Sequence, residues 1–318
     1  MQQHITLRLE RRNIGSSCST HQGSSSLLRR LVLTMGATIA TVVTLSIGAC
    51  QESVAPVARV TIGLNRSSVP LGGPLDLNIR FDMVPDTKGL TEDYRVLIHF
   101  IDENDELLWI EDHDPPQPTS NWNPGQTITY RQRITIPMYP YTGAASVAIG
   151  LYSPTDGTRL PLAGDNIGQR SYRAATLIIE PQPESSFLIY DDGWHSAEFS
   201  PDGRTTWRWT TARSTLVFRN PRTDVSLALE LEGRPDLFEA PQEVTLVIDG
   251  RTLQQFTLDK SEPVFIETEF HSSDLGTAET VRLELHVDKI FVPAEQGENQ
   301  NDNRELGARL WYAFLETH

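Results

Sequence analysis

The stretch LDLNIRFD, residues 75–82, alternates apolar and polar side chains with a period of two. Successive side chains of a β-strand point to opposite faces of the sheet, so this pattern predicts a half-buried strand. Its apolar face consists of Leu75, Leu77, Ile79 and Phe81, which we expect to point into a core. No neighbouring stretch keeps a helical period, and the sequence therefore predicts an all-β fold.

Similar runs, bounded by turn-forming Gly, Pro, Asp and Asn, lie on both sides of this stretch. They cover residues 57–65, 94–102, 107–111, 127–136, 145–153 and 172–180. Seven short strands at this spacing are typical of an immunoglobulin-like β-sandwich, which we place at residues 57–180.

Residues 181–186 hold two prolines and no apolar anchor, which indicates a linker. Eight or nine further strands follow, and Asp249-Gly250 is a hairpin turn between two of them. Strands in this number, with long acidic loops, fit a jelly roll, which we place at residues 187–318. The fold class is thus all-β, with two β-sandwich domains.

The last strand, GARLWYAFLE at residues 307–316, is apolar on both faces. Regular alternation places Leu310, Tyr312 and Phe314 on one face, and Trp311 and Leu315 on the other. A strand that is apolar on both faces is expected in the middle of its sheet.

The first fifty residues have the composition of an export signal. Arg29 and Arg30 precede an apolar stretch at residues 31–49 that ends in small residues. The sequence IGAC at 47–50 resembles the lipobox of bacterial lipoproteins. In that family a diacylglyceryl group is attached to the cysteine sulfur, and the chain is cleaved so that the cysteine becomes the first residue.

By this resemblance, residues 1–49 are a signal segment, Cys50 is the lipidated residue and residues 50–56 are a tether. The protein would be exported and held at the cell envelope by its lipid, so that a membrane is its first partner. If the host has two membranes, Gln51 favours the outer one, because lipoproteins of this family with such a residue after the cysteine are sorted there. The alternative is an uncleaved anchor helix at residues 31–49.

Composition restricts partners and chemistry. The chain has 42 Asp and Glu against 27 Lys and Arg, a net charge of −15, which argues against nucleic acid as a partner. Cys18 lies in the signal segment, so Cys50 alone remains and a cysteine-based metal site is ruled out. The sequence lacks G-x-S-x-G, H-E-x-x-H and Gly-rich phosphate motifs, and we expect no enzymatic activity.

Residues 96–162 resemble the accessory β-sandwich of bacterial membrane glycosyltransferases. The shared motifs are HFID at 99–102, DPPQPTSNWNPG at 114–125 and GLYSPTDGTRLPL at 150–162. This resemblance implies an envelope or glycan setting and carries no catalytic motif.

The second half is similar to galactose-binding-like jelly rolls, the fold of many carbohydrate-binding modules. The stretches that carry the similarity are WRWTTARSTLVFRNP at 207–221 and RELGARLWYAFLE at 304–316. Such a fold alone is a poor guide to a ligand.

The stretch YDDGWHSAEF offers the first candidate ligand site, formed by Asp191, Asp192, Trp194 and His195. An indole ring stacks on the apolar face of a pyranose, and carboxylates accept hydrogen bonds from its hydroxyls. Trp122 is the second candidate, because its proline-rich loop would expose it. The alternatives are a Trp194 that packs on the edge of the sandwich and a Trp122 inside a self-packed loop.

Three further features have two interpretations each. Trp207 and Trp209 share one strand face and form either a glycan platform or part of a core. The acidic stretch EDHD at 111–114 either binds a cation or is a polar turn. The stretch 295–305, rich in acidic and amide residues, either holds a structural calcium or is a solvated loop, and otherwise no cofactor is expected.

Together these features predict a non-enzymatic, lipid-anchored envelope protein that binds glycan, or another envelope component, through loops of the second domain. The alternative is a structural or assembly lipoprotein that docks on a membrane complex processing polysaccharide. A glycan binder should expose a tryptophan in a polar-lined site, whereas an assembly protein should expose a flat apolar patch.

Overall fold

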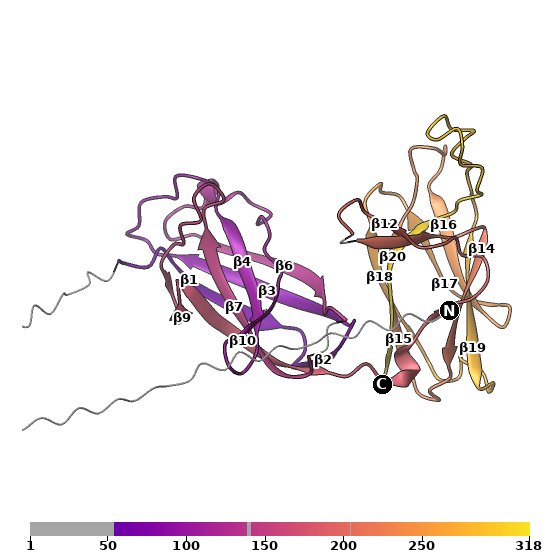
Figure 1. Ribbon diagram of the computed structural model, residues 1–318, viewed down its shortest axis with the longest axis horizontal. Helices are drawn as coiled ribbons and strands as arrows, with labels where there is room; N and C mark the ends of the chain where they lie inside the picture. Colours follow the sequence, from indigo (N-terminus) through magenta and orange to yellow (C-terminus); the bar gives the residue numbers. More distant parts are fainter. Residues whose placement is uncertain (1–53, 139–140, 204) are drawn as a thin grey trace, which may run out of the picture. The chain divides into compact units, whose positions relative to one another are not determined.

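A computed structural model of the chain describes residues 54–318 except 139, 140 and 204 (Figure 1). The signal segment, Cys50 and the start of the tether lie outside these residues. Every regular element in the described part is a β-strand or a short 3-10 helix. Across these residues there is no helix of the length and apolarity that a bilayer crossing needs. The strands form two β-sandwiches, which confirms the all-β fold class.

The first sandwich has a four-stranded sheet in the order β6-β3-β1-β8. It packs against a six-stranded sheet in the order β2-β10-β7-β4-β5, in which β9 also pairs with β10. The 3-10 helix η1 (Thr119–Asn121) lies between β5 and β6. The strand bounds are β1 (Ala58–Leu64), β2 (Ser68–Pro70), β3 (Pro74–Met83), β4 (Arg95–Ile101), β5 (Leu107–Ile110), β6 (Thr127–Thr135), β7 (Gly143–Tyr152), β8 (Leu162–Ala163), β9 (Asp165–Gly168) and β10 (Ser171–Glu180).

The N-terminal segment of this sandwich is shared between its sheets. Strand β1 pairs antiparallel with β3 in one sheet, and β2 pairs parallel with β10 in the other. The stretch at residues 75–82 lies within β3, and Leu75, Leu77, Ile79 and Phe81 are all 0% exposed. The period of two therefore predicted which side chains fill the space between the sheets.

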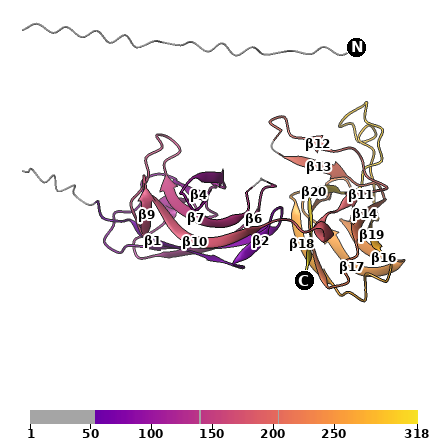
Figure 2. The same ribbon diagram turned by 60° about the horizontal axis from the view of Figure 1, so that its bottom comes forward.

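The second sandwich has two five-stranded sheets, in the orders β11-β14-β19-β16-β17 and β12-β13-β20-β15-β18 (Figure 2). It follows the 3-10 helix η2 (Glu184–Ser186). The strand bounds are β11 (Ile189–Tyr190), β12 (Glu198–Phe199), β13 (Thr206–Trp209), β14 (Arg213–Arg219), β15 (Val225–Glu232), β16 (Gln242–Ile248), β17 (Arg251–Leu258), β18 (Val264–Phe270), β19 (Thr280–Val287) and β20 (Arg309–Thr317). Two apolar clusters, one between the sheets and one around Trp209, Phe291 and Leu306, stabilise it.

Strand β20 lies in the middle of its sheet, as predicted, but its faces differ from regular alternation. The pairing with β15 shifts between Glu230 and Leu231, where β20 carries one extra residue, Trp311. The bulge turns Leu310 and Leu315 toward the same core, and the predicted face that grouped Leu310 with Tyr312 and Phe314 is therefore wrong.

Candidate functional site

Trp122 is buried, and the expectation that its ring is exposed to a ligand is wrong. The side chain is 1% exposed, and its ring lies 5.0 Å from that of Phe81 between centroids. The indole N–H donates to the carbonyl of Gln117, 3.0 Å away in the same loop. The proline-rich loop folds on itself around η1, so that its largest side chain fills the end of the core.

Trp194 is half-buried at the edge of the second core. Its ring meets that of Tyr190 edge-on, with 5.1 Å between centroids, and its N–H donates to the Thr215 carbonyl at 2.8 Å. This packing was the alternative interpretation of the motif. The preceding Gly193 has φ +77° and lies so close to β14 that an added Cβ would be 1.8 Å from the Arg213 carbonyl oxygen.

The polar residues around Trp194 do not converge on one point. Asp191 pairs with Arg282 at 2.8 Å, while Asp192 accepts the N–H of Gly193. His195 Nε2 lies 2.8 Å from the Glu305 carbonyl oxygen. Binding of a ligand by Asp191, Asp192, Trp194 and His195 therefore stays a prediction.

A different group of side chains forms what we call the tryptophan face: Trp207, Trp209, Arg309, Trp311, Glu198 and Glu232. It forms because β13 and β20 pair antiparallel, with Trp209 opposite Arg309. The rings of Trp207 and Trp311 lie 5.0 Å apart between centroids and are inclined at 47°. Both are half-buried, whereas Trp209 is only 4% exposed and packs on Phe291.

Carboxylates fix both half-buried rings of the tryptophan face by their edges. Trp311 Nε1 donates to Glu232 at 2.7 Å, and Trp207 Nε1 donates to Glu198 at 3.0 Å. An indole whose N–H is held in this way keeps its orientation, while the flat faces of the ring are left to apolar contacts.

Arg309 lies among the three tryptophans. The centre of its guanidinium is 4.5 Å from the Trp209 ring, 5.3 Å from Trp311 and 5.5 Å from Trp207. It also forms an ion pair of 3.2 Å with Glu232, and the Glu232 side chain is 13% exposed. Cation–π attraction and this ion pair hold the rings of the tryptophan face together.

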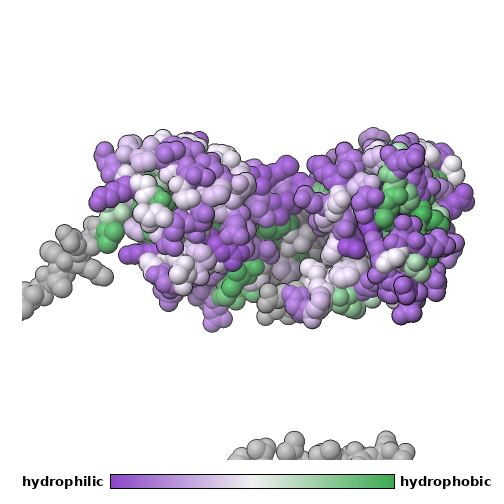
Figure 3. Space-filling view, turned by 90° about the horizontal axis from the view of Figure 1, so that it is seen from above, coloured by the Kyte–Doolittle hydropathy of each residue, from purple (hydrophilic) through white to green (hydrophobic). Residues whose placement is uncertain are grey.

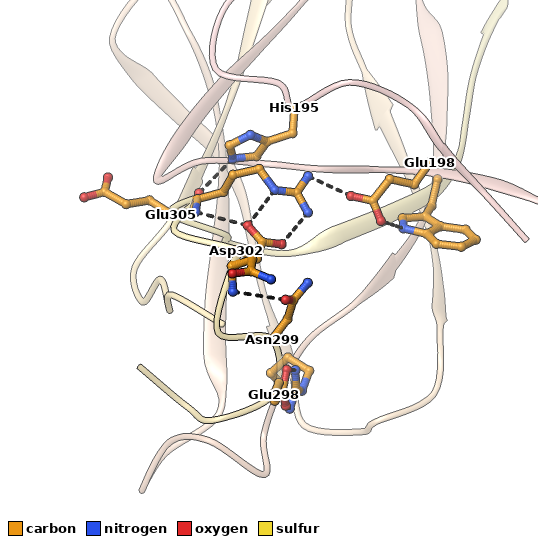
Figure 4. Close-up of polar contacts among 10 residues, drawn as sticks. His195, Glu198, Glu298, Asn299, Asp302 and Glu305 are labelled. Atoms are coloured by element: carbon orange, nitrogen blue, oxygen red, sulfur yellow. Dashed lines mark hydrogen bonds and ion pairs between the residues drawn. The ribbon is translucent and has the colours of Figure 1, made fainter. Parts of the chain in front are cut away.

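The long acidic loop before β20 supports this face from one side (Figure 4). Arg304 binds Asp302 through two hydrogen bonds, at 2.9 and 2.7 Å, and reaches Glu198 at 2.7 Å. The guanidinium lowers the pKa of the Asp302 carboxyl to about 2. Glu298 is bound in turn by Arg234.

The calcium alternative for this loop is untested. Within residues 54–318, leaving aside the three undescribed positions, no group of His, Cys, Asp or Glu has the arrangement of a metal site. The acidic stretch of the first sandwich has protein partners as well. Asp112 accepts the Ile98 N–H at 2.9 Å, His113 Nε2 lies 2.9 Å from the Tyr130 hydroxyl, and Asp114 pairs with Arg95.

The tryptophan face contains residues that the sequence did not single out as a group. The sequence places Trp207 and Trp209 on one strand face, but it does not connect Arg309, Trp311, Glu198 and Glu232 with them. A possible signal was the register between the last strand and TTWRWT, which pairs two tryptophan-containing strands. Chemically, the face offers flat apolar surface beside fixed acceptors, which suits the binding of a polyhydroxylated ligand.

No family model and no curated protein sequence matches this chain. Among solved structures, the C-terminal family 6 carbohydrate-binding module of a laminarinase from Zobellia galactanivorans is 8% identical, with a TM-score of 0.26, over 42% of this chain and 99% of that one. The family 22 xylan-binding module from Paenibacillus barcinonensis is 9% identical, with a TM-score of 0.24, over 41% and 85%.

A 4-O-methyl-α-glucuronidase with specificity for decorated arabinogalactans is also similar, at 9% identity and a TM-score of 0.29. The match covers 48% of this chain but only 20% of the glucuronidase. At such low TM-scores these similarities assign no ligand to the chain.

Proposed function

We propose that this protein binds glycan without enzymatic activity, and that the tryptophan face is the contact surface. The observation that supports this most is the pair Trp207 and Trp311. Both residues are half-buried, and their indole N–H groups are held by Glu198 and Glu232. A ligand therefore meets rings that are already oriented, and it loses little affinity to ordering them.

The chemistry of the face favours a neutral glycan. A pyranose has an apolar face of C–H groups that suits an indole ring, and hydroxyls that donate to carboxylates. Among the described residues, oxygen Oε1 of Glu232 accepts one long bond of 3.3 Å, from Arg309, which leaves it a lone pair for a sugar hydroxyl. The net charge of −15 opposes the approach of polyanionic chains.

The experiment is affinity electrophoresis of the full chain in gels containing neutral polysaccharides, namely β-glucan, xylan, galactan and starch. At least one should retard the wild type. Trp311→Ala and Trp207→Ala should each weaken binding about tenfold or more, which corresponds to about 1.4 kcal/mol. Trp194→Ala is the matched control and should bind like the wild type. Retardation lost only in Trp194→Ala would instead place the site in the loop of residues 191–195.

We further propose that the protein acts at the cell envelope, held there by a lipid on Cys50. The lipobox-like sequence before this residue supports the proposal. Intact mass of the protein made in a bacterial host should match a chain that begins at Cys50 with acyl groups, and Cys50→Ala should lose them. A chain that keeps residues 31–49 without modification would contradict the proposal.

The alternative, docking on an envelope complex, has one supporting observation. Phe187 and Ile189 lie two residues apart at the start of the second sandwich and are 52% and 61% exposed. In the view of Figure 3, hydrophilic residues cover most of the visible surface and apolar residues form small separate patches. If no polysaccharide retards the wild type, and Ile189→Glu abolishes co-purification of a membrane complex, docking is the function.

A further inference from the structure

Two arginines of the first sandwich, Arg159 and Arg170, donate to backbone carbonyls of each other's segments. Arg159 donates through Nη1 to the Gln169 carbonyl at 3.1 Å, and Arg170 donates through Nη1 to the Arg159 carbonyl. Each guanidinium is therefore pinned to the segment that carries the other. Within the part of the chain that the structure describes, neither forms an ion pair, although most other arginines of this acidic chain do.

The two side chains line one open depression of about 430 Å³, together with Gly157 and Gln169. A neighbouring depression of about 340 Å³ shares Arg159 and Gln169 with it. Both arginines are half-buried, so their charges have lost part of their hydration without gaining a counter-charge from the protein. That loss of hydration is unfavourable for an unpaired charge, and an anionic ligand would offset it.

The neighbouring depression adds no free carboxylate to the site. Its one acidic lining residue, Asp105, is bound by Arg173. His99 also lines it, and burial lowers the pKa of this imidazole, which disfavours its charged form. The two guanidinium groups therefore dominate the charge of the combined surface.

The backbone of the hairpin loop that carries Arg170 is strained. Strand β9 ends at Gly168 and β10 begins at Ser171, which leaves Gln169 and Arg170 as a two-residue loop. Their φ angles are +49° and +56°, the left-handed conformation that such loops usually give to Asn and Gly. Long polar side chains have no conformational advantage there, and strain of this kind is often found where a side chain has a binding role.

A glycine of the neighbouring strand allows the loop to lie where it does. A Cβ added at Gly150 in β7 would be 3.1 Å from the Arg170 carbonyl oxygen, tighter than ordinary packing. The glycine thus lets the loop lie close against β7. Arg170 is thereby placed beside Arg159, which follows β7 in the chain.

We propose that Arg159 and Arg170 form a binding site for an oxyanion, the phosphate or the carboxylate group of a small molecule. Each guanidinium uses Nη1 for a backbone carbonyl and keeps other N–H groups for a ligand. The planar fork of N–H donors in a guanidinium matches the oxygens of a phosphate or carboxylate. This site lies in the first sandwich and does not depend on the tryptophan face.

The test is isothermal titration calorimetry of the full chain with inorganic phosphate and with sodium glucuronate, at constant ionic strength. We expect saturable binding of at least one anion. The anion that binds more tightly shows whether the site prefers a phosphate or a carboxylate group. Arg159→Gln should weaken binding at least about tenfold, and Arg159→Lys should fall between it and the wild type, because lysine keeps the charge but loses the fork.

Arg170→Gly separates binding from folding. Glycine relieves the left-handed strain, so the midpoint of thermal unfolding should stay or rise while anion binding is lost. Arg213→Gln, at an exposed arginine in β14, is the matched control and should bind like the wild type. The proposal is overturned by the absence of saturable heat with both anions, by equal affinity in the double variant Arg159→Gln/Arg170→Gln, or by a lower unfolding midpoint in Arg170→Gly.

Discussion

Trp122 in the first sandwich and Trp311 in the second use the same side chain in opposite ways. Trp122 comes from a proline-rich loop but is 1% exposed, and its N–H stays within that loop on the Gln117 carbonyl. Trp311 comes from a central strand but is half-buried, and its N–H is held by the Glu232 carboxylate. The partner of the indole N–H thus distinguishes the two rings better than the kind of element that carries each.

The largest expected effect is on folding, in Trp122→Ala. Removing a large buried aromatic should lower the free energy of unfolding by about 3–5 kcal/mol, because the cavity at the end of the core cannot close. Urea unfolding followed by circular dichroism measures it, with Trp311→Ala for comparison. Equal losses in the two variants would remove the distinction between a core ring and a surface ring.

Gly193→Ala should also lower the free energy of unfolding, by more than the ~1–3 kcal/mol that left-handed strain alone costs. The added Cβ would collide with the Arg213 carbonyl, 1.8 Å away. Gly250→Ala is the control for strain without collision, because φ there is +73° and no atom lies within 4 Å of the added Cβ. If the two variants unfold at the same urea concentration, the loop before Trp194 is not held against β14.

Glu232→Gln tests whether the surface rings depend on charge. Glutamine can still accept the Trp311 N–H, but it no longer balances Arg309, so we expect a loss of about 1–3 kcal/mol in unfolding free energy. Glycan affinity should fall as well, because the ring is held less firmly. The exposed Glu295→Gln should change neither quantity. Unchanged stability and affinity in Glu232→Gln would show that the pair with Arg309 is unimportant.

The smallest effect concerns pH. The pKa of Asp302 is about 2 in the folded protein, below its ordinary value of 3.8. A carboxyl whose pKa is lowered by folding stabilises the fold above its unfolded pKa, and this contribution is lost as pH falls from about 4 to about 2. Asp302→Asn should therefore be less stable than the wild type at neutral pH and nearly equal to it near pH 2. A difference independent of pH would exclude the ion pair with Arg304 as its cause.

Much of the fold follows from local sequence. Residues 75–82 fall within β3 and bury the expected face, because a period of two is a property of the strand itself. The final strand shows where this reasoning ends. Its bulge at Trp311 depends on the pairing with β15. That pairing cannot be predicted from the residues of the final strand alone.

The tryptophan face was harder to predict for the same reason. Glu198 and Arg304 are 106 residues apart in the sequence, but Arg304 Nη1 donates to Glu198 Oε1 at 2.7 Å. Residue type alone pointed to Trp194 and Trp122, whose N–H groups bind backbone carbonyls. Only the tertiary structure shows that the N–H groups of Trp207 and Trp311 are held by carboxylates.

The most direct measurement is fluorine NMR of the full chain labelled with 5-fluorotryptophan. The chain has six tryptophans, which give six assignable signals. The polysaccharide that retards the wild type is added as a soluble oligosaccharide. Our account predicts that the Trp207 and Trp311 signals shift together and saturate, while those of Trp109 and Trp122 stay in place. A shift confined to Trp194, or no shift at saturation, would contradict the assignment of the tryptophan face as the glycan-binding surface.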